Sequence, residues 1–135
     1  INDVVPDSEA AYTYEQIHTA KQPLPLKESK HDVFRVAVSR SHQTPETATY
    51  IDGMRELHPE IEIVEQGSSY KFCMMAEGEI DYYPRTTSTY EWDTAAAELI
   101  LVEAGGAVYS LPDHKPLRYN KPDLRNPWFE CRRFK

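Results

Sequence analysis

Between residues 33 and 109 the sequence alternates between short apolar stretches that favour strands and longer stretches that favour helices. Residues 33–38 (VFRVAV) are β-branched and apolar enough for a buried strand. Thr44-Pro45-Glu46 then shows the hydroxyl cap, first-turn proline and acidic residue that begin a helix. Strands and helices that alternate along a chain form a mainly parallel sheet with helices packed on its faces. The sequence therefore predicts an α/β fold with a mostly parallel sheet and helices on both faces.

The same alternation predicts the remaining elements of this fold. Strands are expected at 61–64, 80–83 and 107–109, and helices at 45–57, 70–77 and from 92 to the glycines at 105–106. The last helix contains Ala95–Ala97, Leu99, Ile100 and Val102, which predict a helix buried nearly all round. With 135 residues, the chain has room for one domain of common size.

The first 30 residues differ from the rest of the chain. Residues 1–19 are acidic and aromatic with little sustained periodicity, and Pro23 and Pro25 favour extended backbone. We therefore interpret residues 1–30 as a connector that lies across a surface, and residues 31–135 as one α/β domain. No apolar run reaches the roughly 20 residues of a membrane span, and no secretory signal is visible.

Charge and cysteine content limit the function classes. The chain has 15 Lys+Arg and 22 Asp+Glu, a net charge of −7, so it lacks the basic surface that nucleic acid requires. Cys73 and Cys131 form neither a disulfide framework nor a metal knuckle. We expect a cytoplasmic protein without a nucleic-acid partner, and peripheral membrane association stays open.

The first candidate site is the segment Gly67-Ser68-Ser69-Tyr70-Lys71, where a strand leads into a helix. A helix start with unpaired backbone N–H groups suits an anion such as phosphate. Serine hydroxyls add donors, and Lys71 adds a full positive charge. The alternative is a serine cap with a solvated lysine, and the residues alone favour this alternative.

The second candidate is Asp93, at the start of the expected helix after residue 92. Its carboxylate can cap the helix by accepting a backbone N–H. A carboxylate is also a ligand for Mg²⁺, which takes one or two protein carboxylates together with water and phosphate oxygens. Spacing alone favours the cap.

The third candidate is the pair His42 and Arg85, in loops that follow two predicted strands. Ligands gather at the carboxyl ends of strands in open α/β sheets. Arginine binds phosphate with a rigid, two-pronged set of donors, and histidine can hydrogen-bond or stack on a ligand. A single histidine or arginine in a loop is more often a solvated surface group. Two of them near the same sheet edge are stronger evidence for a ligand site than either residue alone.

Several of these motifs together resemble a known family. The run WDTAA at 92–96, followed by EAGG at 103–106, resembles the C-terminal signature of the inositol monophosphatase-like, Mg²⁺-dependent phosphatases. Within that family, the 3'(2'),5'-bisphosphate nucleotidase branch is similar at six further segments spread over residues 33–130: SRSH (39–42), GSSYKFC (67–73), AEG (76–78), YPR (83–85), PLRYN (116–120) and NPWF (126–129).

The resemblance implies a division of the protein into two lobes. The first lobe of the family carries an Asp-Pro-Leu-Asp-Gly-Thr motif and an upstream Glu, and this sequence contains neither. The chain is thus expected to be the C-terminal lobe (residues 31–135) with an interlobe connector (residues 1–30). Its partner would be the missing N-terminal lobe, which is expected to hold the catalytic residues, so this chain alone is expected to be inactive. The exposed lobe interface predicts a homodimer.

The resemblance also implies roles for the candidate residues. Asp93 would bind Mg²⁺, whereas Ser68, Ser69, Lys71 and Arg85 would bind the substrate's sugar and non-scissile phosphate, with His42 near the adenosine. The implied reaction is hydrolysis of adenosine 3',5'-bisphosphate to AMP and phosphate, in sulfur assimilation. An inositol or sugar monophosphatase, and a catalytically inert nucleotide-binding module, are the alternatives.

Overall fold

The computed structural model describes residues 13–21, 23–24, 32–41 and 44–133. The strands in these ranges are β1 (Phe34–Ser39), β2 (Ile61–Gln66), β3 (Tyr82–Arg85), β4 (Ala107–Ser110) and β5 (Phe129–Arg132). The helices are α1 (Tyr14–Ala20), α2 (Pro45–Leu57), α3 (Tyr70–Ala76) and α4 (Glu91–Glu103).

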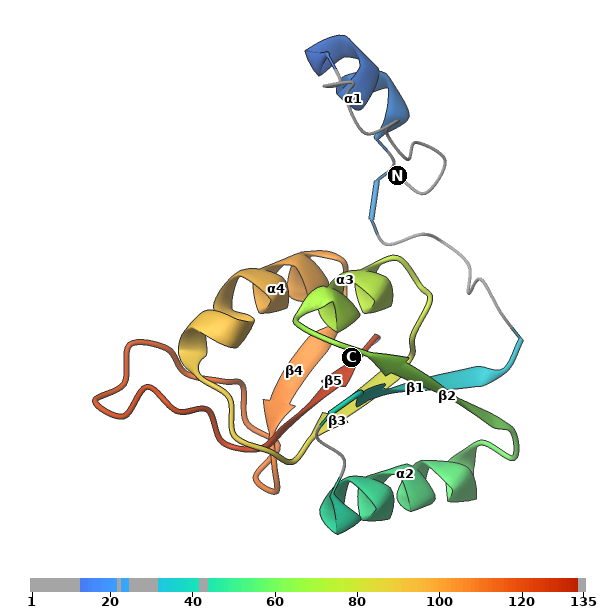
Figure 1. The fold of residues 1–135 in the computed structure, drawn as a ribbon, viewed down its shortest axis with the longest axis vertical. Coiled ribbons are helices and arrows are strands. Elements are labelled where there is room, and N and C mark those ends of the chain that lie inside the picture. The colour runs from blue at the N-terminus through green and yellow to red at the C-terminus, as the bar shows by residue number, and fades with distance from the viewer. Residues whose placement is uncertain (1–12, 22, 25–31, 42–43, 134–135) are drawn as a thin grey trace.

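The five strands form one sheet in the order β2-β1-β3-β5-β4. β1 runs parallel to β2 and β3, whereas β5 runs antiparallel to β3 and β4. Four strands therefore share one direction, and only β5 opposes them among the described strands. Helices α3 and α4 cover one face of the sheet and α2 covers the other (Figure 1). The predicted α/β fold, with a mostly parallel sheet and helices on both faces, is confirmed.

The expected elements occur at or near their predicted positions, with two additions. β5 was not predicted, because its four residues gain their hydrogen bonds only by pairing with β3 and β4, which lie far away in the sequence. α1 was also not predicted. Its start carries a capping box, in which Thr13 accepts from the backbone of Gln16 and the Gln16 side chain accepts from the backbone of Thr13. Every residue of α1 is exposed, and the role of residues 1–30 as a connector stays a prediction.

The core lies between the sheet and helices α3 and α4. Phe72, Tyr83 and Phe129 meet there with ring centroids about 6 Å apart, and the Tyr83 ring meets both phenylalanine rings edge-on. Leu101 of α4 and Cys131 of β5 are fully buried beside them. These contacts fix α3 and α4 side by side over the middle of the sheet.

The prediction that α4 is buried nearly all round is wrong. Ala97 and Leu101 face the core, but Leu99 and Ile100 are 60% and 42% exposed. Only one side of α4 contacts the sheet and α3, so apolar residues on its other side stay at the surface. No helix within the described ranges is long and apolar enough to cross a membrane.

Candidate functional site

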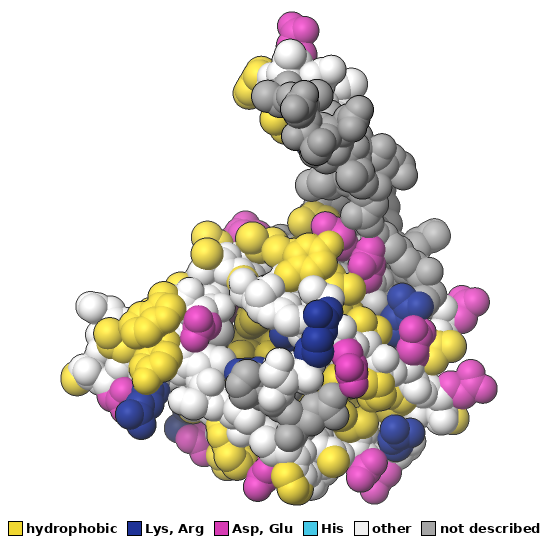
Figure 2. Space-filling model, in the orientation of Figure 1, with side chains coloured by type: hydrophobic (Ala, Val, Ile, Leu, Met, Phe, Trp, Pro, Cys, Tyr) yellow, Lys and Arg dark blue, Asp and Glu magenta, His cyan; other side chains and the backbone are white. Residues whose placement is uncertain are grey.

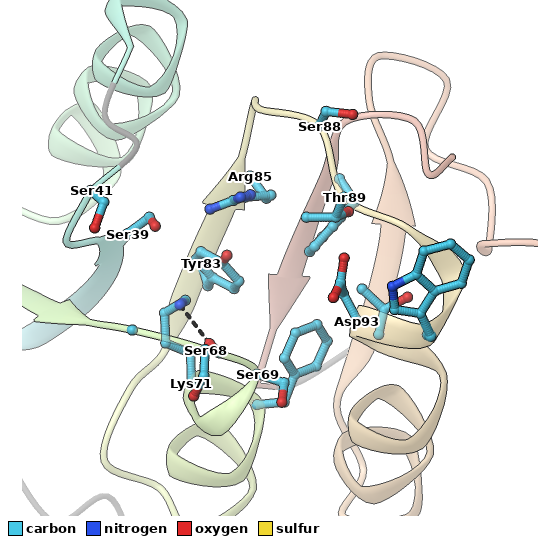
Figure 3. Close-up of a pocket in the computed structure, with 15 residues that line it drawn as sticks. Ser39, Ser41, Ser68, Ser69, Lys71, Tyr83, Arg85, Ser88, Thr89 and Asp93 are labelled. Carbon is cyan, nitrogen blue, oxygen red and sulfur yellow. Dashed lines mark hydrogen bonds between the residues drawn. The ribbon is translucent and has the colours of Figure 1, made fainter. Parts of the chain in front are cut away.

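A cavity of about 410 Å³ lies at the carboxyl ends of β1 and β3 and beside the first turns of α3 and α4 (Figure 3). The cavity contains five of the six residues predicted from the sequence. His42, the sixth, lies outside the described residues. The residues that line the cavity are Ser39, Ser41, Gly67, Ser68, Ser69, Lys71, Phe72, Tyr83, Arg85, Ser88, Thr89, Trp92, Asp93, Thr94 and Phe129.

Lys71 is a buried cation in the wall of this cavity, with only 2% of its surface exposed. Its Nζ donates to the carbonyl oxygens of Ser68 at 2.7 Å and Gln66 at 2.9 Å, and lies 4.8 Å from the centroid of the Tyr83 ring. Burial, followed by the nearby charge of Arg85, lowers the pKa of Lys71 to about 8. The alternative of a solvated lysine is therefore wrong.

The turn before α3 is shaped by Lys71 and by its own serines. Ser68 has a left-handed backbone conformation (φ 55°), and its carbonyl is held by Lys71. Its hydroxyl accepts from the N–H of Tyr70 at 3.2 Å, while Ser69 occupies the N-cap position without a side-chain cap hydrogen bond. A Cβ built on Gly67 would meet no atom within 4 Å, so the backbone there borders open space.

Arg85 ends β3 and brings a second cation to the cavity. Its Nε is buried and has no hydrogen-bond partner among the described residues. Leaving a buried donor of a charged group unsatisfied costs about 1–3 kcal/mol or more, so such a group calls for an acceptor. Because Arg85 lines the cavity, an anion bound there would lie beside its guanidinium.

Asp93 uses one carboxylate oxygen as a helix cap. Its Oδ2 accepts from the backbone N–H of Tyr90 at 2.8 Å, closing the first turn of α4. Within the described ranges its Oδ1 has no hydrogen-bond partner, and the side chain points into the cavity (Figure 3). The two interpretations of Asp93 are thus compatible, because one oxygen caps the helix while the other can still bind a ligand.

The described residues fit a Mg²⁺ ion only in part. Asp93 supplies one suitable oxygen, and Mg²⁺ takes one or two protein carboxylates with water and phosphate oxygens. No group of three or more His, Cys, Asp or Glu residues within the described part of the chain could hold a metal ion. Further acidic ligands would have to come from outside these residues.

Some residues at the site were not predicted from the sequence. Ser88, Thr89 and Trp92 line the cavity. The loop 86–91 is not a close match to the family pattern, so the resemblance did not predict that Ser88 and Thr89 belong to the site. Asn126 does not line the cavity but fixes its edge. Its Nδ2 donates to the carbonyl of Tyr90 at 2.9 Å and to the hydroxyl of Thr94 at 3.0 Å. Only the tertiary structure places residue 126 beside the start of α4.

The fold and the cavity together define an α/β domain with a cavity at the carboxyl ends of its strands, lined by two cationic side chains. The sequence matches the inositol monophosphatase family over residues 6–127, and the chain belongs to this family of phosphatases. Members of the family generally depend on metal ions.

Individual relatives place the chain near one branch of the family. The 3'(2'),5'-bisphosphate nucleotidase CysQ of Escherichia coli K12 is 36% identical over 115 residues, which cover 84% of this chain and 40% of that protein. The crystal structure of CysQ from Bacteroides thetaiotaomicron has 44% sequence identity and a TM-score of 0.79, covering 92% of this chain and 45% of that one. An uncharacterized protein of Rhizobium leguminosarum bv. phaseoli is 51% identical over 69 residues, or 47% of this chain and 72% of that protein.

The predicted resemblance to the 3'(2'),5'-bisphosphate nucleotidase branch is confirmed by these comparisons. The chain spans less than half the length of both CysQ relatives.

Proposed function

We propose that this chain supplies the substrate-binding part of a Mg²⁺-dependent phosphatase that converts adenosine 3',5'-bisphosphate to AMP and phosphate. The observation that carries the proposal is that two cationic side chains, Arg85 and the buried Lys71, line the same cavity. Because the relatives are named 3'(2'),5'-bisphosphate nucleotidases, we propose the same substrate class and a role in sulfur assimilation.

The positive charges of the cavity suit one phosphate group of the ligand. The chain as a whole carries a net charge of −7, yet Lys71 and Arg85 bring two positive charges into one cavity. Lys71 gives two of its three N–H donors to backbone carbonyls, which leaves one for a ligand. The guanidinium of Arg85 can hold a phosphate with two parallel hydrogen bonds. One phosphate dianion, with a second pKa of about 6, would balance both charges, so we propose that the second phosphate lies at Asp93 with the Mg²⁺ ion.

Asp93 would hold the Mg²⁺ ion through Oδ1. When bound, Mg²⁺ supplies an activated water and stabilises the leaving oxygen of a phosphate ester. The chain's own residues then have a binding role: Lys71 and Arg85 orient the non-scissile phosphate, and Ser68 and Ser69 face the sugar. We propose that the remaining acidic ligands belong to the lobe that precedes this chain in the full-length protein.

The direct test is a calorimetric titration of the 135-residue chain with adenosine 3',5'-bisphosphate, with AMP and with inositol 1-phosphate. We expect the bisphosphate to bind at least tenfold more tightly than AMP, and Arg85→Ala to remove this difference. Arg55→Ala is the matched control, because Arg55 is exposed on α2 and does not line the cavity. Equal affinity for all three ligands would contradict the proposed substrate, and a preference for inositol 1-phosphate would favour the inositol phosphatase instead.

Catalysis is tested separately from binding. We expect no phosphate release by this chain alone, and Mg²⁺-dependent release when it is combined with the preceding lobe. Tight nucleotide binding without release from the combined protein would identify an inert nucleotide-binding module. Release by the chain alone would show that the described residues already contain a complete catalytic site.

A further inference from the structure

The two strands that bring Arg85 and Ser39 to the cavity are paired over a short length. Among the described residues, β1 and β3 are in register at one position, where Val36 lies opposite Tyr82. Further along each strand, Ser39 and Arg85 both line the cavity (Figure 3). The register pairing between these strands therefore ends before they reach the cavity, and it does not fix how the two strand ends lie relative to each other.

A cluster of threonine hydroxyls joins the same two parts of the fold. Thr86 directly follows Arg85, and its Oγ1 lies 2.9 Å from Oγ1 of Thr44 and 2.6 Å from Oγ1 of Thr47. Thr44 and Thr47 lie at the start of α2, where the Thr44 hydroxyl also accepts from the N–H of Thr47 at 3.3 Å. The cluster thus connects the end of β3 to the start of α2, which is the helix that follows β1.

The hydroxyls of this cluster are shielded from water. Thr86 and Thr47 are only 4% and 5% exposed. A hydroxyl has one donor and two acceptor sites, so Thr86 can bond both threonines of α2 at once. A buried hydroxyl that loses its partner costs about 1–3 kcal/mol, because water does not replace the bond. A shift of the β3 end against α2 would break these bonds, so the cluster resists such a shift.

Residues on both sides of the cluster line the cavity. Ser39 and Ser41 come from the end of β1 and the turn after it, and Arg85 comes from the end of β3 (Figure 3). On the surface, basic side chains border a hollow in the middle of the face (Figure 2). A ligand that contacts Arg85 and the serines together needs them at a fixed separation. Holding that separation before the ligand arrives lowers the entropy cost of binding.

We propose that Thr86 is a positioning residue, whose hydroxyl bonds to Thr44 and Thr47 and so holds Arg85 where it meets a phosphate of the substrate. This inference rests on the proposed function and adds a residue that does not itself line the cavity. Thr86 acts on the ligand through Arg85. Its loss should therefore lower the affinity only as far as Arg85 contributes to it.

The test measures the dissociation constant of adenosine 3',5'-bisphosphate by calorimetry in matched variants. Thr86→Val keeps the shape of the side chain and removes the hydroxyl, and we expect it to weaken binding roughly three- to tenfold. Thr86→Ser keeps the hydroxyl and should restore most of the affinity. Thr49→Val is the control, because the exposed Thr49 hydroxyl bonds within α2, to the carbonyl of Pro45, and its removal should leave the affinity unchanged.

A double-mutant cycle separates positioning from a general loss of stability. Arg85→Ala removes the guanidinium, so adding Thr86→Val to this variant should weaken binding no further. A loss of affinity of the same size with and without Arg85, or no loss in either case, would show that Thr86 does not act through Arg85.

A second readout needs no ligand. The Nε of Arg85 is buried, so its proton should exchange slowly with water and give a resolved NMR signal, identified by its absence in Arg85→Ala. Thr86→Val should shift or broaden this signal, whereas Thr86→Ser and Thr49→Val should preserve it. An unchanged signal in Thr86→Val would overturn the positioning role. If the wild-type chain does not bind the bisphosphate, the proposed function fails, and this signal alone decides whether Thr86 fixes Arg85.

Discussion

The backbone N–H of Tyr90 donates a 2.8 Å hydrogen bond to Oδ2 of Asp93, so one carboxylate both caps α4 and faces the cavity. The cap holds the side chain in one orientation, with Oδ1 left for another partner. Structural and functional roles can therefore be separated by substitution at this position.

Asp93→Asn should preserve most of the cap and remove the charge, whereas Asp93→Ala removes both. We expect Asp93→Ala to lower the free energy of unfolding by about 1 kcal/mol, and Asn to cost clearly less, because an amide oxygen can still accept from Tyr90. Urea unfolding measures this difference. Mg²⁺ should strengthen nucleotide binding in the wild type but in neither variant. If Asp93→Asn kept the full Mg²⁺ effect, this residue would not be a metal ligand.

Nucleotide affinity should fall as the pH rises through about 8, where Lys71 loses its proton. Phosphate monoesters are already largely ionised there, since their second pKa is about 6. Burial raises the pKa of Tyr83 and of Cys131, so these neighbours stay neutral, and Arg85 stays charged. Titrations at pH 7 and 9 should differ for the wild type and agree for Lys71→Met. A drop of the same size in Lys71→Met would assign the effect to another group.

The same pKa shift predicts that stability rises with pH, in the opposite direction to nucleotide affinity. The folded pKa of Lys71, about 8, lies below the usual 10.5, so between these values the unfolded chain binds more protons than the folded chain. This residue's contribution to the free energy of unfolding should thus increase from pH 8 to pH 10.5. Urea unfolding at several pH values measures this increase. Between pH 8 and 10.5 the free energy of unfolding should rise more steeply with pH in the wild type than in Lys71→Met.

Gly67→Ala should leave the stability of the ligand-free chain nearly unchanged, because a Cβ there meets no atom within 4 Å. Gly67 lines the cavity, and we expect the added methyl group to weaken binding of the bisphosphate several-fold. Thermal unfolding and calorimetry on the same sample check both parts. Unchanged affinity would show that the ligand does not approach this turn closely.

Gly106→Ala should destabilise the fold by about 1–3 kcal/mol, because a Cβ at this position would overlap the Leu101 side chain and lie 2.8 Å from the carbonyl oxygen of Arg132. The backbone of β5 cannot give way without disturbing its pairing with β4. Gly53→Ala is the matched control: its Cβ meets open space inside α2, so it should stabilise by about 0.5–1 kcal/mol. Equal effects of the two substitutions would contradict this packing.

Asn126→Ala should lower the free energy of unfolding by about 1–3 kcal/mol, because it leaves the carbonyl of Tyr90 and the hydroxyl of Thr94 without their shared donor. It should also loosen the start of α4 and weaken nucleotide binding. Exchange of the α4 amide protons with solvent is the measurement that locates the effect. Protection of these amides equal to the wild type would show that Asn126 does not hold the helix start.

Local sequence signals were sufficient for α2. Thr44 accepts from the N–H of Thr47 at 3.3 Å, and Pro45 begins the helix, as the residue types alone predicted. A capping box is equally local, and the one at Thr13 and Gln16 shows that α1 was also predictable from its sequence. Such signals act within a single helical turn, so they do not depend on the rest of the fold.

By itself, the sequence determined the order of most strands and helices and the predominantly parallel sheet, because hydrophobic periodicity is a property of neighbouring residues. The resemblance to a known family implied that the five predicted residues of the cavity belong to one site. The tertiary structure alone decided the antiparallel pairing of β5, the exposure of Leu99 and Ile100, the burial of Lys71 and the position of Asn126. Each of these depends on contacts between segments far apart in the chain, and such contacts cannot be predicted from the sequence of either segment alone.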